Sequence, residues 1–237
     1  MSILCGKTSL ITGASGGIGL ALAETFASAG SNLVLVYRNE KKLKNFHKLL
    51  EKYSDQILID FVKCDLSSGE DIQELISSME EKRVDVLVNN AGIFPIKNIS
   101  NSTLSDYEEC FNVNVKAPFL LSKFLGSKMI DKKWGRIVNI GSSSSYNGSE
   151  DTGLYCASKH ALLGLTRSLY KEYKKHNVRV YCVSPGSAQT DMGKTDTRQD
   201  FSTFITPKEI AEYITFMISF DGEGISEEVR INRMVIR

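Results

Sequence analysis

Short apolar runs alternate with longer amphipathic segments along almost the whole chain, and this alternation constrains the fold more than any other feature. Each run is rich in Val, Ile or Leu without period-two alternation, which is typical of strands buried on both faces of a parallel sheet. Parallel strands need crossover connections, so the segments between the runs are expected to cover the sheet. The six clearest runs are Thr8–Thr12, Asn32–Tyr37, Ile57–Lys63, Val84–Asn89, Arg136–Ile140 and Val178–Val183.

The connecting segments predict helices, and the pattern continues more loosely after Val183. The predicted helices are Gly17–Ala29, Glu40–Tyr53, Ser68–Glu81, Ser105–Lys132, Thr152–His176 and Pro207–Phe220, and a final strand is predicted over Glu228–Arg237. We therefore expect an α/β fold: a single doubly wound Rossmann-type domain over residues 1–237. Its sheet is expected to be mostly parallel and seven-stranded, with helices on both faces.

Composition and charge exclude several classes of function. Of the 237 residues 42% are hydrophobic and 24% charged, which is ordinary for a soluble globular domain. The 29 Lys and Arg residues nearly balance the 28 Asp and Glu residues, giving a formal net charge of +1. Without a field of one sign, we expect neither a nucleic-acid partner nor a membrane partner.

The five cysteines stand singly, without a Cys-x-x-Cys pair. This pattern favours neither a disulfide framework nor a zinc site, so no metal is predicted. Residues 1–13 lack a basic region followed by an apolar one, and no signal peptide is expected. Unpaired thiols without a signal peptide favour a cytoplasmic location.

A glycine-rich turn, Thr12-Gly13-Ala14-Ser15-Gly16-Gly17-Ile18-Gly19, joins the first predicted strand to the first predicted helix. Glycines there let the backbone approach a pyrophosphate closely, and the helix N-terminus offers free N–H groups to phosphate. A plain strand–helix turn is the alternative reading. The position between the first strand and the first helix favours dinucleotide binding.

The end of the second predicted strand indicates which dinucleotide is bound. An acidic residue there would accept a hydrogen bond from the 2′-hydroxyl of NAD, but this chain has Tyr37-Arg38. The guanidinium of Arg38 suits a 2′-phosphate, so NADP(H) is favoured over NAD(H). The alternative is a solvated arginine at a strand end.

Tyr155 and Lys159 are spaced i, i+4 on a predicted helix and share one of its faces. A nearby ammonium favours the phenolate form of tyrosine, whose pKa is ordinarily about 10. The pair therefore predicts a group that donates or accepts a proton near neutral pH. The i, i+4 spacing alone is weak evidence for a catalytic pair, because the same spacing of Tyr and Lys also arises on surface helices.

Three more motifs accompany the pair and the glycine turn: Asn89-Asn90-Ala91-Gly92, Ser142 and Pro185-Gly186, each directly after a predicted strand. With these motifs in this order, the chain resembles the short-chain dehydrogenase/reductase family from about Gly6 to Met192. Within the family it is similar to members that act as 3-oxoacyl-[acyl-carrier-protein] reductases.

The resemblance implies a catalytic set. Tyr155 resembles the acid/base that protonates the carbonyl oxygen, and Lys159 resembles the group that lowers the pKa of the tyrosine and holds the nicotinamide ribose. Ser142 is similar to the serine that hydrogen-bonds the substrate oxygen, with residues 143–145 as competing candidates. Asn114 resembles the helical asparagine that supports a proton-relay water. The alternatives are Asn112 in that role, or a purely structural Asn114.

The resemblance also implies a set of cofactor contacts. Asp65 resembles an adenine contact, and the loop that contains Pro185 resembles the one that contacts the carboxamide of the nicotinamide. Asn89 and Asn90 could equally hold the central strands together. The implied contacts are Gly13, Ser15, Gly16, Gly17, Ile18, Gly19, Arg38, Asp65, Leu66, Asn90, Ala91, Gly92, Tyr155, Lys159, Pro185, Gly186, Ala188 and Thr190.

The function implied is that of an NADP(H)-dependent oxidoreductase that acts on CH–OH groups, interconverting a ketone or aldehyde and an alcohol by hydride transfer. The alternatives are a reductase specific for 3-oxoacyl thioesters, and a non-catalytic NADPH-sensing protein on the same fold. A sensor would not need the proton donor that Ser142, Tyr155 and Lys159 provide.

Two regions depart from the family pattern. The segment over residues 187–206, which resembles the substrate lid, is short and predicts an open pocket. The C-terminal end lacks the Thr-Gly dipeptide of the family, which puts its contacts in doubt. The predicted helices over Ser105–Lys132 and Thr152–His176 resemble a subunit interface, so a homodimer or homotetramer is expected, with a small-molecule carbonyl or alcohol as the substrate.

Overall fold

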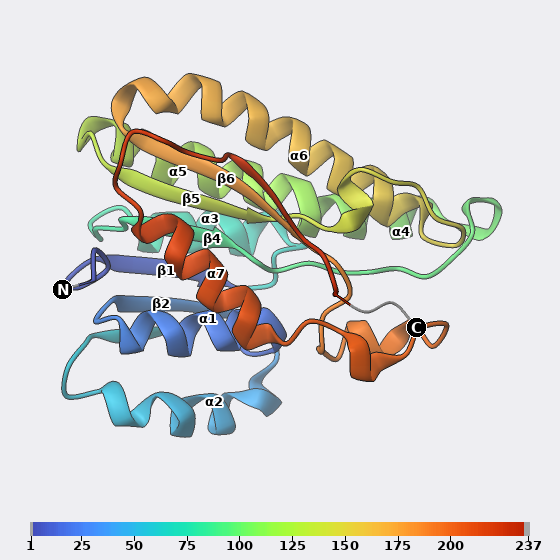
Figure 1. The fold of residues 1–237 in the computed structure, drawn as a ribbon, viewed down its shortest axis with the longest axis horizontal. Coiled ribbons are helices and arrows are strands. Elements are labelled where there is room, and N and C mark those ends of the chain that lie inside the picture. Colours follow the sequence, from blue (N-terminus) through green and yellow to red (C-terminus); the bar gives the residue numbers. More distant parts are fainter. Residues whose placement is uncertain (1, 235–237) are drawn as a thin grey trace.

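The computed structural model describes residues 2–234, apart from the side chains of residues 42–45. Seven parallel strands form one sheet in the order β3-β2-β1-β4-β5-β6-β7 (Figure 1). The order reverses between β1 and β4, as in a doubly wound fold, so the predicted fold class is confirmed. The strands are β1 (Thr8–Thr12), β2 (Asn32–Tyr37), β3 (Ile59–Lys63), β4 (Val86–Asn89), β5 (Gly135–Ile140), β6 (Val178–Pro185) and β7 (Glu228–Ile231).

Helices cover both faces of the sheet (Figure 1). The face that carries α1, α2 and α7 packs one apolar cluster against the strands, with Phe26, Phe46 and Ile214 buried in it. The opposite face, with α3, α5 and α6, packs a second cluster that contains Ile72 and Leu121. The helices are α1 (Gly17–Ser28), α2 (Leu43–Leu50), α3 (Gly69–Ser78), α4 (Leu104–Phe111), α5 (Ala117–Asp131), α6 (Gly153–Tyr173) and α7 (Pro207–Ser219).

The long helix expected over Ser105–Lys132 is interrupted. A π-helical turn over Asn112–Lys116 separates α4 from α5. Pro118 explains the interruption, since it has no N–H to donate to the carbonyl of Asn114 and its ring would crowd that carbonyl in a regular α-helix. Such single π turns occur often at functional sites.

Two other predicted elements are shorter than expected. The helix predicted over Glu40–Tyr53 has an α-helical centre, α2, flanked by 3₁₀ turns. The last strand ends at Ile231, opposite Pro185, because the strand that it pairs with ends there. Residues 235–237 of the predicted strand lie outside the described residues.

Polar side chains tie the central strands together on the inside. Asn89 at the end of β4 donates to Asn139 of β5 at 2.7 Å and to Ser122 of α5 at 3.2 Å. Asn139 in turn donates to Thr166 of α6 at 2.9 Å. All four side chains are buried, so this network fixes β4 and β5 beneath the loops that follow them.

No helix in the described part of the chain is long and apolar enough to cross a membrane. The five cysteines are free thiols, and four of them are buried.

Candidate active site

A cavity of about 630 Å³ opens at the carboxyl ends of the parallel strands. In doubly wound sheets ligands bind at this edge, where the strand order reverses. The cavity brings together every implied catalytic or cofactor residue except Gly19 and Asn114. Those that line it are Gly13, Ser15, Gly16, Gly17, Ile18, Arg38, Asp65, Leu66, Asn90, Ala91, Gly92, Ser142, Tyr155, Lys159, Pro185, Gly186, Ala188 and Thr190.

The glycine turn forms one wall of this cavity and leaves the start of α1 uncapped. Gly13 has φ +64°, and a Cβ there would lie 2.9 Å from the Cα of Ala91. Gly16 occupies the N-cap position without a side-chain hydrogen bond, and no acidic residue lies in the first turn. The free N–H groups and the positive end of the helix dipole therefore face the cavity, an arrangement that fits a pyrophosphate.

Asn90 holds the glycine turn in place. Its side-chain amide donates to the carbonyl oxygens of Thr12 at 2.9 Å and Gly13 at 3.1 Å. The Thr12 hydroxyl accepts from the backbone N–H groups of Asn90 and Ala91, each at 3.0 Å. Asn90 thus joins the loop after β4 to the turn after β1, whereas its neighbour Asn89 joins the central strands.

Arg38 is exposed at the end of β2 and lines the cavity beside Asn39. Asp65, an acidic residue of the same lining, accepts from the backbone N–H and the hydroxyl of Ser67 at 3.0 and 2.8 Å. The carboxylate of Asp65 is therefore engaged in its own loop. Since the residues after β2 offer a guanidinium and an amide, this end of the cavity suits a phosphate better than a lone ribose hydroxyl.

Tyr155 and Lys159 lie side by side on the buried face of α6, as their spacing predicts. Their exposed fractions are 8% and 4%, and the Lys159 Nζ lies 5.7 Å from the centroid of the Tyr155 ring. Lys159 donates to the carbonyl oxygen of Ile140 at 2.8 Å. The ring of Phe94 packs edge-on against Tyr155, with 4.7 Å between centroids. The phenol and the ammonium are thus fixed at the base of the cavity.

Burial controls the pKa values of this pair. It raises the pKa of Tyr155 to about 12, against an opposing hydrogen bond from Ser142, and it lowers the pKa of Lys159 to about 8. Lys159 is not among the causes that act on the pKa of Tyr155 in this arrangement, so the expectation that it lowers this pKa stays a prediction. At neutral pH Tyr155 is therefore a neutral phenol, the form that can donate a proton.

Ser142 stands apart from the three serines that follow it. Its side-chain hydrogen bond to Tyr155 lowers the pKa of the phenol, and its hydroxyl accepts from the backbone N–H of Ser144 at 3.1 Å. Ser143 and Ser144 also line the cavity. Ser145 is buried and accepts from the backbone N–H of Ser142. Ser142 is thus the serine of this loop that is bonded to Tyr155.

Asn114 lies behind the cavity wall, in the π turn. It accepts from the backbone N–H of Ile93 at 2.9 Å and donates to the carbonyl of Ile93 at 3.0 Å and to Ser158 at 3.0 Å. A Cβ on Gly92 would lie 3.3 Å from its Oδ1. Asn112, the alternative, donates instead to the carbonyl of Ser67. Asn114 therefore supports the loop after β4, and the same Cβ on Gly92 would lie 3.7 Å from the Nζ of Lys159.

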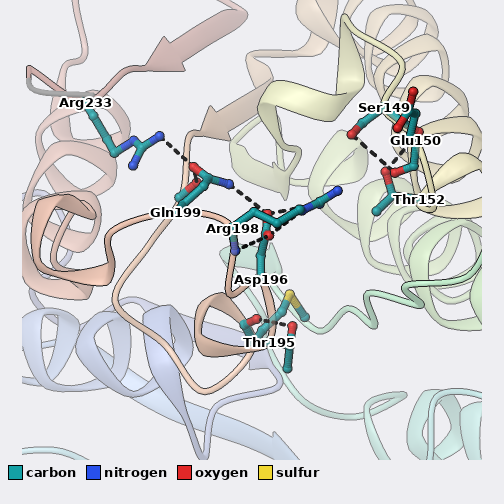
Figure 2. Close-up of polar contacts among 10 residues, drawn as sticks. Ser149, Glu150, Thr152, Thr195, Asp196, Arg198, Gln199 and Arg233 are labelled. Carbon is teal, nitrogen blue, oxygen red and sulfur yellow. Dashed lines mark hydrogen bonds and ion pairs between the residues drawn. The ribbon is translucent and has the colours of Figure 1, made fainter. Parts of the chain in front are cut away.

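A polar chain that the sequence did not predict joins Arg233 to residues 196–199 of the segment predicted to form a lid (Figure 2). Arg233 donates to the side-chain carbonyl of Gln199 at 2.7 Å, and the amide of Gln199 donates to Asp196 at 2.8 Å. Arg198 pairs with the same carboxylate through Nε at 2.7 Å and Nη2 at 3.2 Å. The opposite charges of Asp196 and Arg198, two residues apart, were the available signal.

Comparison with known proteins gives consistent matches. The family model for short chain dehydrogenases matches residues 7–200. The 3-oxoacyl-[acyl-carrier-protein] reductase FabG of Rickettsia felis is 35% identical, over 97% of this chain and 96% of the relative. FabG of Aquifex aeolicus is also 35% identical, over 95% of each chain.

Solved structures match with similar coverage. A putative NAD(P) dependent gluconate 5-dehydrogenase from Beutenbergia cavernae, with bound NADP, has a TM-score of 0.86 and 29% identity, covering 97% of this chain and 95% of that one. A metagenomic short-chain oxidoreductase in complex with NADP has a TM-score of 0.83 and 30% identity, covering 98% and 99%.

Proposed function

The chain belongs to the short-chain dehydrogenase family as an NAD(P)-dependent oxidoreductase, and from this premise we propose that it interconverts a ketone or aldehyde and the corresponding alcohol with NADP(H). The observation that carries the proposal is the placement of Ser142 beside the buried Tyr155 and Lys159 at the base of a cavity whose other wall is an uncapped glycine turn. The nicotinamide supplies the hydride when the cofactor is bound.

Different residues of the cavity would bind different parts of the cofactor. The glycine turn and the start of α1 would hold the pyrophosphate, and Arg38 would hold the 2′-phosphate. The residues that follow β6, from Pro185 to Thr190, would hold the carboxamide of the nicotinamide. The preference for NADP(H) over NAD(H) is supported by Arg38 and by the NADP and NADPH that are bound in structural neighbours.

The proton chemistry falls to the side chains. The hydroxyl of Ser142 would hold the carbonyl oxygen of the substrate, and the neutral phenol of Tyr155 would donate the proton to that oxygen. Lys159 would hold the nicotinamide ribose and place a positive charge close to the phenol. Asn114 would act on this set indirectly, through the loop that it supports. It would also hold the proton-relay water that the family resemblance implies.

A reductase specific for 3-oxoacyl thioesters is the second candidate, and the names of the curated relatives favour it. Those relatives share about a third of their residues with this chain. The structural neighbours include a putative gluconate 5-dehydrogenase and an acetoin dehydrogenase. We therefore propose the broader class, carbonyl reduction, as the function.

We propose in addition that the protein is a cytoplasmic homodimer or homotetramer. Leu104, Tyr107 and Phe119 of α4 and α5 are exposed, on the helices that resemble a subunit interface. Light scattering on the purified protein tests the assembly, and a monomer at micromolar concentration would contradict it.

The activity is tested by following NADPH and NADH oxidation against ketones, aldehydes, sugars and acetoacetyl thioesters. We expect NADPH-dependent turnover that falls by at least about 100-fold in Tyr155→Phe, since the general acid is removed. The binding of NADPH should persist in this variant. Tight NADPH binding without Tyr155-dependent turnover on any substrate would favour the sensor alternative.

A further inference from the structure

We propose that Arg198 is a specificity-determining residue that selects uncharged polyhydroxylated carbonyl compounds by hydrogen-bonding the substrate hydroxyls away from the reacting carbon. This inference rests on the proposed function and names its substrate class. It begins from the polar chain Arg233–Gln199–Asp196–Arg198, in which each side chain restricts the conformations of the next.

The position of Arg198 is fixed from behind. Gln199 is held by Arg233 and by the hydroxyl of Ser187, which donates to its side-chain carbonyl at 3.0 Å. Gln199 and Arg198 then both donate to Asp196. These donors hold the pKa of Asp196 down, at about 2, with Arg198 the largest cause. A carboxylate bonded to both side chains orients the guanidinium before any substrate arrives.

Asp196 uses only one edge of the guanidinium. It takes Nε and Nη2, while no hydrogen bond joins Nη1 to another described residue. The side chain of Arg198 is half exposed and lines the cavity. Figure 2 shows it extending from Asp196 toward Ser149, Glu150 and Thr152 on the opposite rim. The free edge of the fork is therefore available to a molecule inside the cavity.

The surrounding charges disfavour an anionic substrate. Asp196 already balances the charge of Arg198. Glu150 and Asp151, on the opposite rim, are close enough to contribute to the raised pKa of Arg198, whose largest cause is the hydrogen bond to Asp196. Three carboxylates thus act on this guanidinium, and the other cation of the polar chain, Arg233, is held behind Gln199. A carboxylate or phosphate on the substrate would meet net repulsion here, whereas a neutral acceptor would not.

The same site disfavours a purely apolar substrate. Ser149 and Thr152 line the rim opposite Arg198, and Asn147 lies beside them in the lining. The hydroxyl of Thr152 is buried and donates to the carbonyl of Ser149 at 3.4 Å, so the exposed polar groups here are Asn147, Ser149 and the free edge of Arg198. An alkyl chain against them would remove their water without replacing its hydrogen bonds, which costs affinity. Hydroxyl groups both donate and accept, so they can satisfy the guanidinium edge and the oxygens facing it.

The test compares three four-carbon ketones that differ in hydroxyl content and in charge. Erythrulose carries three hydroxyls, 2-butanone carries none, and acetoacetate is an anion without hydroxyls. We expect the wild-type enzyme to have its highest kcat/KM on erythrulose. In Arg198→Met that kcat/KM should fall by roughly 10- to 100-fold, the loss of one charge-assisted hydrogen bond. On 2-butanone it should change by less than about threefold, because no such bond is lost.

Arg83 provides the matched control. It pairs with Asp85, also two residues away, through Nε at 2.8 Å, and its exposure is similar to that of Arg198. It lies just before β4, at the end of the sheet opposite the cavity. Arg83→Met should leave kcat/KM unchanged on all three substrates, and NADPH affinity should be unchanged in both variants.

The other possible results contradict either this inference or the proposed function. A preference for acetoacetate that Arg198→Met abolishes would replace this inference with an anion site. An equal loss on erythrulose and 2-butanone, or no wild-type preference for erythrulose, would also overturn it while leaving the proposed function intact. An absence of Tyr155-dependent turnover on all three substrates and on the wider panel would overturn the proposed function itself.

Discussion

At the scale of single residues, the site places charge where a nicotinamide dinucleotide and a carbonyl would need it. Arg38 lines the cavity at the end of β2, and Lys159 lies at its base. The two cations differ in their surroundings. Arg38 is exposed, whereas Lys159 is surrounded by protein. A substitution of Arg38 should therefore change cofactor affinity, and a substitution of Lys159 should also change the stability of the fold.

Arg38→Asp should weaken NADPH binding by about 10- to 100-fold, since it replaces a donor to the 2′-phosphate with a like charge. NADH affinity should stay nearly constant or rise, because a carboxylate at this position can accept from a ribose hydroxyl. Fluorescence titration of the two cofactors measures both values. Equal losses for NADPH and NADH would remove the case for the phosphate.

Lys159 should make stability depend on pH in a defined direction. Burial lowers its pKa to about 8 in the folded state, whereas the unfolded chain keeps a value near 10.4. Between these values the unfolded state binds more protons, so the contribution of Lys159 to the unfolding free energy rises with pH. Below pH 8 the full cost of burying the ammonium is present.

Urea unfolding of the wild type and Lys159→Met at several pH values tests this. The unfolding free energy of Lys159→Met minus that of the wild type should be largest at pH 7 and should fall toward pH 10.5. The exposed Lys171→Met serves as the control and should show no such trend. A difference between wild type and Lys159→Met that is independent of pH would contradict the assignment.

At the scale of elements, the π turn over Asn112–Lys116 links the two halves of the site. It directs Asn114 inward, where both polar groups of the side chain bond to Ile93. The loop that carries Asn90 and Gly92 is thus supported from below by Asn114 and joined to the glycine turn by Asn90. Neither contact lies within one helix or strand.

Asn114→Ala should destabilise the protein by about 2–3 kcal/mol, because it leaves the part-buried backbone N–H and carbonyl of Ile93 without partners. Activity should fall as well, since the loop that lines the cavity with Asn90 and Gly92 loses its support. Asn112→Ala, in the same π turn, removes a single hydrogen bond to Ser67 and should cost less, about 1 kcal/mol. Equal losses of stability in urea would contradict the supporting role of Asn114.

At the scale of the whole molecule, a buried arginine connects the sheet to the C-terminal part of the chain. Arg136 of β5 is fully buried, donates to the carbonyls of Gly135 and Ile218, and pairs with Asp221 at 2.6 Å. Its guanidinium also lies over the ring of Trp134, 4.4 Å from the centroid. It therefore fixes the end of α7 against the edge of the sheet opposite the cavity.

Arg136→Ala should destabilise the fold by about 3–5 kcal/mol, because it leaves a cavity and unpaired carbonyls. Asp221→Asn should cost less, about 1 kcal/mol, since the Asp221 side chain is 57% exposed and water can replace it in part. Thermal and urea unfolding measure both. NADPH affinity in the folded fraction should be unchanged, as Arg136 does not line the cavity.

The sequence by itself determined the parallel sheet, the glycine turn and the shared face of Tyr155 and Lys159. Each of these follows from a local rule: apolar runs, glycine at a strand–helix junction, or i, i+4 spacing on a helix. The order of those motifs along the chain was enough to indicate the family. The residues that they predicted, apart from Gly19 and Asn114, line one cavity.

The division of the predicted helix at Asn112–Lys116 is a local effect of Pro118, which a prediction from the apolar pattern did not take into account. The tertiary structure alone decided two matters. Burial, which depends on every element packed around α6, decided the pKa of Tyr155. The polar chain joins Gln199 to Arg233, 34 residues apart and outside regular structure. No local periodicity encodes such contacts, because long-range packing creates both the desolvation and the pairing.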